Sequence, residues 1–535
     1  MKKILALALA VAMLLSCGAA LAEEERMTDR FMPPHVNEGQ YPVPGNKTLS
    51  WWMEINKSAV AFISSYAENT AYQEIEKQTG INIEFIHPTV GMAKEQFNLL
   101  FMDTGSLPDI IMLSNDTWYE GGLNQMYEDG LIIDVAPYLE QYAPQYKSLV
   151  DGNRTASKKI YQGDNADRIY GFYRMDLGKA IPFNRCICRA DWLEEFGMSV
   201  PTTIAEYEAY FDAVLANKPG VTPFYMSLSD SSQQVLLMGA FDMYCNWYQI
   251  DGQAHYYANE PAYKDYLALM NKWYEKGYMG TDFGTIGNAQ IRKLYSAGTV
   301  GCLVVPIGNA YSDSKASGTP IAKTPFQSYS EDAKIHVYNL GVNVNNGYCT
   351  VVTTACDEKL LPIVCQFLNY TYTDEGSVFA NRGPEGLSWV ATDDQGGFKF
   401  TDWVIHNELY ETSIMHNVCR MTYWPCKRIP DTQCSPNLLR DETAVALRLQ
   451  YADRENWDNA WLMPTSVTLT TDENNERLKI MSNVDTYVSE MSLKFIRGEA
   501  DLETGWDAYV QQLAAYKLSR AVEITQGAYD RYLSR

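Results

Sequence analysis

The sequence predicts an α/β fold, and two observations carry this prediction. Between residues 48 and 133, short apolar segments alternate with segments of helical periodicity, which is typical of crossover units and a mostly parallel sheet. The alternation returns between residues 298 and 383. The chain has 535 residues, of which 46% are hydrophobic, so it is long enough for two or three domains or one large bilobed unit.

The elements of the first half follow from the apolar pattern. Residues 48–55 suit a strand, and the alternation in 81–85 predicts another. A helix over 93–104 presents its aromatic residues on one face and ends at a glycine. The run IIML at 110–113 predicts a short buried strand, and after a further helix extended structure resumes at 131–133.

The second half repeats these signals. Residues 298–306 and 348–353 read as buried strands, and the apolar spacing over 360–368 is that of an amphipathic helix. Thr373 or Asp374 caps the next helix, which stops near Gly383. Beyond residue 435 the chain is expected to be mainly helical, apart from a turn-rich stretch at 464–475.

The first 22 residues predict export from the cytoplasm. Lys2 and Lys3 precede an apolar run over residues 4–15, which is too short to span a membrane and is typical of a secretory signal peptide. The sequence LLSC ending at Cys17 favours lipidation of that cysteine, whereas ALA ending at Ala22 offers an alternative cleavage site. We expect a secreted protein anchored by lipid to the outer face of the cell membrane, with the Pro/Gly-containing residues 23–46 as a flexible linker.

Charge and composition exclude several classes of protein. The chain has 43 basic and 66 acidic residues, a net charge of −23, and no basic stripe that would indicate a nucleic-acid partner. It also contains no G-x-S-x-G, H-E-x-x-H or glycine-rich phosphate loop, and its histidines show no catalytic pairing. These observations favour a protein that is not an enzyme. A secreted glycoside hydrolase remains the alternative, because sequence spacing cannot reveal the separation of paired carboxylates.

The cysteines predict buried thiols. Cys186 and Cys188 should point to one face of a strand and do not form a redox C-x-x-C pair. The nearest approach to a metal cluster is the set His416, Cys419, Cys426 and Cys434. Its spacings do not match those of structural zinc sites, so we expect no metal and no cofactor.

Several motifs occur in order along almost the whole chain after residue 46. In the first half they are GSLPDII at 105–111, YEDGLI at 127–132, RIYGF at 168–172, RADWL at 189–193 and VPTT at 200–203. In the second half they are TDEG at 373–376, NRGPEG at 381–386, KFIRG at 494–498, WDAYV at 506–510 and YDRY at 529–532. Together they resemble the family 1 extracellular solute-binding proteins of bacterial ABC importers, especially the large lipoproteins of Gram-positive bacteria.

The resemblance implies a periplasmic-binding-protein-like fold, in which two α/β lobes joined by crossing segments enclose a ligand cleft and close about a hinge. The first lobe should comprise residues 47–173 and about 340–400, and the second about 174–339 and 401–535. It also implies a monomer that captures an oligosaccharide and delivers it to a membrane permease. Some relatives carry a calcium loop after the helix that follows VPTT, but residues 216–221 lack the oxygen ligands, so no calcium is expected there.

Candidate ligand-binding residues are those that sugar sites use, namely aromatic platforms and polar side chains. Asn115, Asp116 and Trp118 follow the strand at 110–113, and the resembling segment of maltodextrin-binding proteins uses an Asp and an aromatic residue to contact sugar. We expect Trp118 to stack on the ligand and Asp116 to accept hydrogen bonds. The alternatives are a helix cap for Asp116 and core packing for Trp118.

The other candidates lie where the chain should cross between lobes, in the second lobe, after the NRGPEG motif and in a proline-rich loop. They are Tyr173, Arg174 and Asp176; Tyr244, Asn246 and Trp247; Glu385 and Trp389; and Trp424 and Arg428. Arg174 could clamp hydroxyls or a carboxylate, or make a surface ion pair. A peptide receptor, or a receptor for another solute on the same fold, remains an alternative to an oligosaccharide receptor, because fold alone does not select a ligand.

Overall fold

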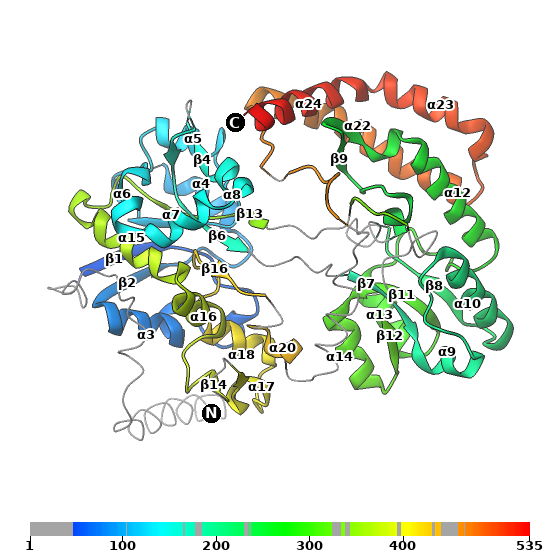
Figure 1. Cartoon of the computed structure of the whole chain (residues 1–535), viewed down its shortest axis with the longest axis horizontal. Helices are drawn as coiled ribbons and strands as arrows, with labels where there is room; N and C mark the ends of the chain where they lie inside the picture. Colours follow the sequence, from blue (N-terminus) through cyan, green and yellow to red (C-terminus); the bar gives the residue numbers. More distant parts are fainter. Residues whose placement is uncertain are drawn as a thin grey trace.

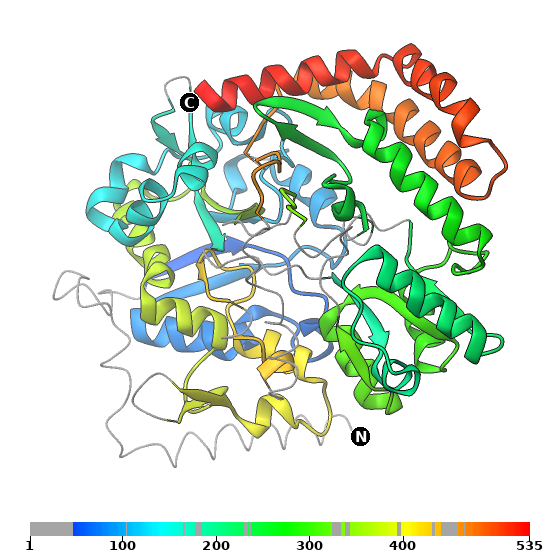
Figure 2. The same cartoon turned by 45° about the vertical axis from the view of Figure 1, so that its right-hand side comes forward.

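The computed structural model has two α/β lobes side by side, as the sequence predicts (Figures 1 and 2). It describes residues 47–102, 104–163, 166–176, 184–228, 234, 237–323, 333–337, 343–392, 397–430, 434–439, 458–464 and 466–534. The expected signal peptide, Cys17, Ala22 and the linker at 23–46 lie outside this part of the chain. None of the helices in the described residues combines the length and apolarity that a membrane crossing needs.

The first lobe is organised around a six-stranded sheet with the order β16-β6-β13-β3-β1-β2. Its strands are β1 (Lys47–Trp52), β2 (Ile81–Ile86), β3 (Ile110–Leu113), β6 (Phe172–Asp176), β13 (Asn343–Val352) and β16 (Lys427–Arg428). β1 runs parallel to β2 and β3, as crossover units require, whereas β13 is antiparallel to both β3 and β6. The sheet therefore joins segments that are more than 200 residues apart in the sequence, because Cys349 pairs with Leu113.

Helices cover this sheet and bury their apolar faces against it. They are α3 (Thr70–Thr79), α4 (Ala93–Leu100), α5 (Gly122–Glu128), α6 (Ala136–Tyr142), α7 (Pro144–Asp151), α8 (Arg154–Ile160), α15 (Leu361–Asn369) and α16 (Asp374–Arg382). Three further helices, α17 (Asp402–Ile405), α18 (Thr412–Cys419) and α20 (Pro436–Leu439), pack on one another beside a separate apolar cluster. The predicted amphipathic helix is α15, which buries Leu361, Val364 and Phe367. Thr373 caps α16 as expected, since its hydroxyl accepts a hydrogen bond from the Gly376 amide at 2.9 Å.

Two small hairpins complete the first lobe. They are β4 (Tyr161–Gln162) with β5 (Arg168–Ile169), and β14 (Trp389–Ala391) with β15 (Phe398–Phe400). The β4–β5 hairpin stands at the edge of the lobe that faces the end of α24 (Leu518–Ser534) (Figure 1).

The second lobe has a four-stranded sheet with the order β12-β7-β11-β8 and a long helical subdomain. Its strands are β7 (Asn184–Arg189), β8 (Thr222–Tyr225), β11 (Val300–Pro306), β12 (Ile321–Lys323) and the separate hairpin β9 (Trp247–Ile250) and β10 (Gln253–Tyr256). Its helices are α9 (Ala190–Phe196), α10 (Ile204–Asn217), α12 (Pro261–Glu275), α13 (Asn288–Ser296), α14 (Ile307–Ser317), α22 (Thr471–Ile496), α23 (Leu502–Ala515) and α24 (Leu518–Ser534). The last three form the C-terminal helical region that the sequence predicts, above α12 in Figure 1.

The chain returns to the first lobe for longer than the sequence predicts. β16 pairs with Met175 and Asp176 of β6, and the side chain of Asn69 at the start of α3 donates to the carbonyls of Asn417 and Arg420. Residues 401–430 and 434–439 therefore lie with the first lobe, and the expected boundary near residue 400 is too early. Short helices and a proline-rich loop in this stretch carry no apolar period that could have assigned them to either lobe.

The ten cysteines after Cys17 are all buried. Cys186 and Cys188 lie on β7 and both point at Cys302 of β11, with sulfur–sulfur distances of 3.0 and 3.3 Å. Burial raises the pKa of the Cys302 thiol well above its usual range. The prediction of buried thiols is confirmed, and Cys186, Cys188 and Cys302 pack in the hydrophobic core of the second lobe.

Gly171 tests how tightly β6 and β13 are packed. A Cβ at this position would lie 2.6 Å from both the sulfur of Cys349 and the carbonyl oxygen of Thr350, so the strands must separate to admit it. We expect Gly171→Ala to lower the free energy of unfolding by about 1–3 kcal/mol, measured by urea denaturation. Gly527→Ala inside α24 is the matched control, because its Cβ would meet nothing closer than 3.7 Å. Equal stability of the two variants would contradict this packing.

Candidate functional site

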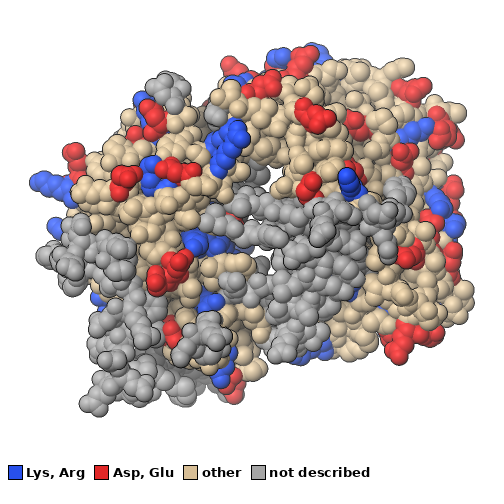
Figure 3. Space-filling view, viewed as in Figure 1, with Lys and Arg blue, Asp and Glu red and all other residues tan. Residues whose placement is uncertain are grey.

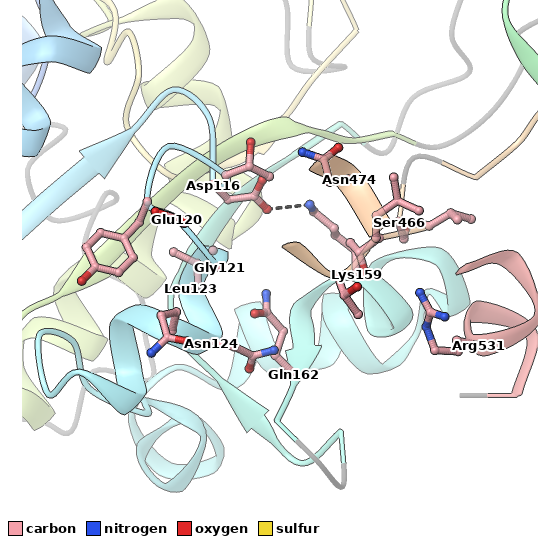
Figure 4. A pocket seen from close by; sticks show the side chains of 18 of the residues that line it. Asp116, Glu120, Gly121, Leu123, Asn124, Lys159, Gln162, Ser466, Asn474 and Arg531 are labelled. Carbon is pink, nitrogen blue, oxygen red and sulfur yellow. Dashed lines mark ion pairs between the residues drawn. The ribbon is translucent and has the colours of Figure 1, made fainter. Parts of the chain in front are cut away.

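A cavity of about 1060 Å³ lies between the two lobes, and we call it the inter-lobe pocket. The first lobe lines it with the loop after β3, the start of α5 and the strand β4. The second lobe lines it with residues 466–470, the first turns of α22 and Arg531 of α24. Figure 4 shows these two walls, with Asp116 and Lys159 on one side and Ser466, Asn474 and Arg531 towards the other.

The loop after β3 fixes a carboxylate in the wall of the pocket. Asp116 is 7% exposed and forms an ion pair with Lys159, with 2.5 Å between Oδ2 and Nζ. The hydroxyl of Tyr173 donates to the same oxygen at 3.2 Å. Oδ1 has no such contact among the described residues, so it remains available to accept a hydrogen bond from a ligand.

Tyr173 supports Asp116 from behind the pocket. Its side chain is fully buried, and its hydroxyl also accepts a hydrogen bond from Gln162, which lines the pocket, at 3.3 Å. Burial, and then the neighbouring Cys349 and Asp116, raise the pKa of Tyr173 well above its usual range. The hydroxyl therefore stays protonated and acts as a donor to the carboxylate.

The second-lobe wall is organised by the N-terminus of α22. Thr470 and Glu473 form a capping box. Nη1 and Nη2 of Arg531 donate to the two carboxylate oxygens of Glu473 at 2.9 and 2.5 Å. This arrangement leaves Asn474 exposed at the pocket. Arg477, one turn further, packs 5.7 Å from the ring of Trp247 and donates to Thr525.

The C-terminus ties the two lobes together beside the pocket. The ammonium group of Lys158 on α8 donates to the carbonyls of Tyr532 and Leu533 at 2.7 and 3.3 Å and lies 4.4 Å from the Tyr532 ring. The next residue, Lys159, lines the pocket. The end of α24 therefore meets the first lobe at one border of the site, where Figure 1 shows the C-terminus near α5.

A smaller cavity of about 250 Å³ lies within the first lobe, and we call it the arginine pocket. It is lined by Arg174, Ser413, His416, Asn417, Arg420, Arg428, Cys434 and Ser435. His416 is buried, and burial together with Arg420 lowers its pKa well below its usual range. Its Nε2 donates to the carbonyl of Asn381 at 3.0 Å, so the ring is neutral and the arginines supply the positive charge of the cavity.

The structure brings some of the predicted residues together. Asn115 and Asp116 line the inter-lobe pocket, with Tyr173 directly behind them, and Arg174 and Arg428 line the arginine pocket. Trp247 does not line the inter-lobe pocket itself, but its ring lies 5.7 Å from the guanidinium of Arg477, which does. Asp176 ends β6 beside Arg428 of β16. Apart from Trp247, which belongs to β9 of the second lobe, these residues come from three separate parts of the sequence and all lie in the first lobe.

Other predicted residues line neither cavity. Trp424 is completely buried in the first core, 4.4 Å from the ring of Trp51. Trp389 is buried and donates to the Gly383 carbonyl, and Glu385 accepts from the Ala391 amide in the same hairpin. Trp118 is half-buried against Phe97 at 5.6 Å, which is the core-packing alternative for this residue. In the second lobe, Tyr244 packs against the core and Asn246 is exposed ahead of β9.

Several pocket residues were missed by the sequence analysis. They are Lys159, Gln162, Ser466, Asn474, Arg477 and Arg531. The turn-rich stretch at 464–475 followed by a capping box was the one available signal, since exposed polar loops before a helix often carry binding residues. Within the described residues no group of three His, Cys, Asp or Glu side chains could hold a metal ion.

Solved structures confirm the periplasmic-binding-protein-like fold of two α/β lobes, and they include extracellular solute-binding proteins. A solute-binding protein from Bifidobacterium longum subsp. infantis is 16% identical and superimposes with a TM-score of 0.70, covering 92% of this chain and 99% of that one. FusA of Streptococcus pneumoniae in complex with kestose is 18% identical, with a TM-score of 0.66 and coverage of 91% and 100%.

Three curated proteins are similar to this chain in sequence. Lipoprotein LipO of Bacillus subtilis is 24% identical over 348 residues, and the polygalacturonan/rhamnogalacturonan-binding protein YtcQ of the same species is 22% identical over 275. The fructooligosaccharide ABC transporter substrate-binding protein FusA is 22% identical over 573 aligned positions, covering 99% of this chain and 98% of FusA. The matches to the first two relatives span 65% and 51% of their lengths. No family model matches the chain.

The stability cost of truncating Trp424 and Trp118 tests how deeply each of these tryptophans is packed in the core. Because Trp424 is completely buried, we expect Trp424→Ala to lower the free energy of unfolding by about 3–5 kcal/mol, as measured by urea denaturation. Trp118→Ala at the half-buried position should cost less. If Trp424→Ala were as stable as the wild type, the assignment of Trp424 to the core would be wrong.

Proposed function

We propose that this protein is the substrate-binding component of an ABC importer and captures an oligosaccharide in the inter-lobe pocket. The observation that carries this proposal is that both lobes contribute hydrogen-bonding side chains to one cavity of about 1060 Å³. Carboxylates, amides, hydroxyls and cations alternate around it, which suits a ligand whose surface is covered with hydroxyl groups. The tyrosines Tyr119 and Tyr161 add ring surface to the first-lobe wall.

The relatives support the same class of ligand. FusA is named for a fructooligosaccharide and YtcQ for pectic polysaccharides, and LipO is named as a lipoprotein. We infer that this chain binds its ligand without turnover and passes it to a permease. We further infer that Cys17 is lipidated, that the linker at 23–46 holds the lobes clear of the membrane, and that the protein acts as a monomer.

Binding without turnover can be measured directly. Kestose, a galacturonate trimer and a neutral glucan trimer are titrated into the purified mature chain by calorimetry, and the sugars are then recovered and analysed. We expect saturable binding of at least one sugar with one site per chain, a higher melting temperature with that sugar, and no cleavage products. Catalytic cleavage would support the glycoside hydrolase alternative and overturn the proposal.

One side chain from each lobe tests where the sugar binds. Gln162→Ala and Asn474→Ala should each weaken binding by about 2- to 12-fold, since a neutral hydrogen bond contributes ~0.5–1.5 kcal/mol. Asn483→Ala is the matched control, because it removes an exposed asparagine of the same helix, α22, away from the pocket. If only the first-lobe variant weakened binding, the ligand would not bridge the lobes.

The anchor is tested by replacing Cys17. In a bacterial host that processes lipoproteins, the wild type should fractionate with the membrane, whereas Cys17→Ala should be released into the medium, because only the lipid holds the chain. Release of both proteins to the same extent would mean that cleavage follows Ala22 and that no lipid anchor forms.

A further inference from the structure

We propose that the arginine pocket is a subsite for the carboxylate group of an acidic oligosaccharide, one that contains uronic acid units. The inference rests on the proposed function and deepens it, because it assigns a charge to the ligand. Three guanidinium groups, those of Arg174, Arg420 and Arg428, line one cavity of about 250 Å³, and within the described part of the chain no Asp or Glu lines it. This occurs in a protein whose net charge is −23. In Figure 3 basic side chains gather over β16, on the side of the first lobe that faces the second.

The environment of Arg174 gives the strongest support for an anion-binding site. Its Nε is buried and has no hydrogen-bond partner among the described residues, and its guanidinium lies 5.5 Å from the ring of Tyr348. Burial, and then the nearby Arg428, lower the pKa of Arg174 to about 10. A buried donor without an acceptor destabilises the folded protein by the full desolvation cost of that group, which a bound anion would offset.

Neutral amides orient the other two arginines. Nε and Nη2 of Arg420 donate to Oδ1 of Asn417 at 3.0 and 2.7 Å, and Nη1 of Arg428 donates to Oδ1 of Asn381 at 2.7 Å. These amides are held in turn, because Asn417 donates to the Ser413 carbonyl and Asn381 to the carbonyls of Ser377 and Lys427. Asparagine is a neutral side chain, so these contacts position the two guanidinium groups without adding a negative charge of their own.

The shape and place of the cavity favour a sugar carboxylate over a free inorganic ion. Guanidinium groups bind planar carboxylates through paired hydrogen bonds, and the cavity volume is several times the ~30 Å³ that one water molecule takes up. Arg174 also follows Tyr173, whose hydroxyl supports Asp116 in the inter-lobe pocket. Consecutive residues of β6 therefore contribute to the two cavities from opposite faces of the strand.

The test compares acidic sugars with their own esters. Galacturonate, mannuronate and guluronate trimers, and the methyl ester of each, are titrated by calorimetry into wild type, Arg174→Gln, Arg174→Lys and Arg428→Gln. We expect at least one acid trimer to bind about tenfold more tightly than its ester, and the glutamine variants to remove most of that difference. Arg174→Lys should retain part of it, since the charge remains but the paired geometry is lost. The neighbouring Lys427→Gln, whose side chain pairs with Asp374 outside the pocket, is the matched control and should behave as wild type.

The outcomes separate the two proposals. Equal binding of acid and ester, or acid binding that survives both glutamine variants, overturns the subsite and leaves the oligosaccharide receptor standing. An Arg174-dependent response to sodium sulfate without any response to acid trimers would show an inorganic anion site and would also overturn it. If no acidic, esterified or neutral sugar binds at all, the proposed function fails as well. Melting curves of each variant verify folding, and Arg428→Gln decides the matter if Arg174→Gln does not fold.

Discussion

The antiparallel pairing of β13 with both β3 and β6 is the constraint on which the rest of the structure depends. Cys349 and Thr350 pair with Leu113 and Met112 on one side and with Tyr173 and Phe172 on the other. The chain must therefore leave the first lobe after β6, build the sheet of the second lobe, and return to insert β13 between strands that were made much earlier. The sheet of the second lobe is in effect an insertion between β6 and β13, and α22, α23 and α24 join that lobe after the chain has returned to the first one.

The same strand pairing organises both cavities. β6 lies between β13 and β16, so consecutive side chains of β6 can act in different surroundings. Tyr173 supports the Asp116–Lys159 ion pair at the inter-lobe pocket, while Arg174 contributes to the arginine pocket near Arg428. Buried polar groups of this kind add little net stability, because their desolvation opposes the gain from pairing. Their concentration on the lobe-facing edge of one sheet is therefore better explained by ligand binding than by stability.

Local patterns in the sequence predicted most of the individual elements and the class of fold. The strand at 110–113 was predicted to the residue, and the helices α15 and α16 were predicted within one or two positions, because apolar spacing and the Thr373 cap are local signals. The direction of β13 and the long return to residue 439 could not be predicted, since they depend on pairings between distant segments.

The residues that line the inter-lobe pocket were harder to predict, because they too come from distant segments. Asp116 follows a strand end and was found, whereas Lys159, Asn474 and Arg531 enter the pocket only because α8, α22 and α24 meet there. Trp424 was placed at the ligand because its loop contains prolines, but the loop returns to the sheet and buries that ring.

The central claim is that one ligand contacts both lobes at once. Hydrogen–deuterium exchange of the mature chain, with and without the sugar that binds most tightly, measures this most directly because it reports backbone protection along the whole sequence. The account predicts added protection both in residues 115–128 and 159–163 of the first lobe and in residues 466–477 of the second, which together line the inter-lobe pocket. Protection confined to one lobe, or found only at segments away from both walls, would contradict it.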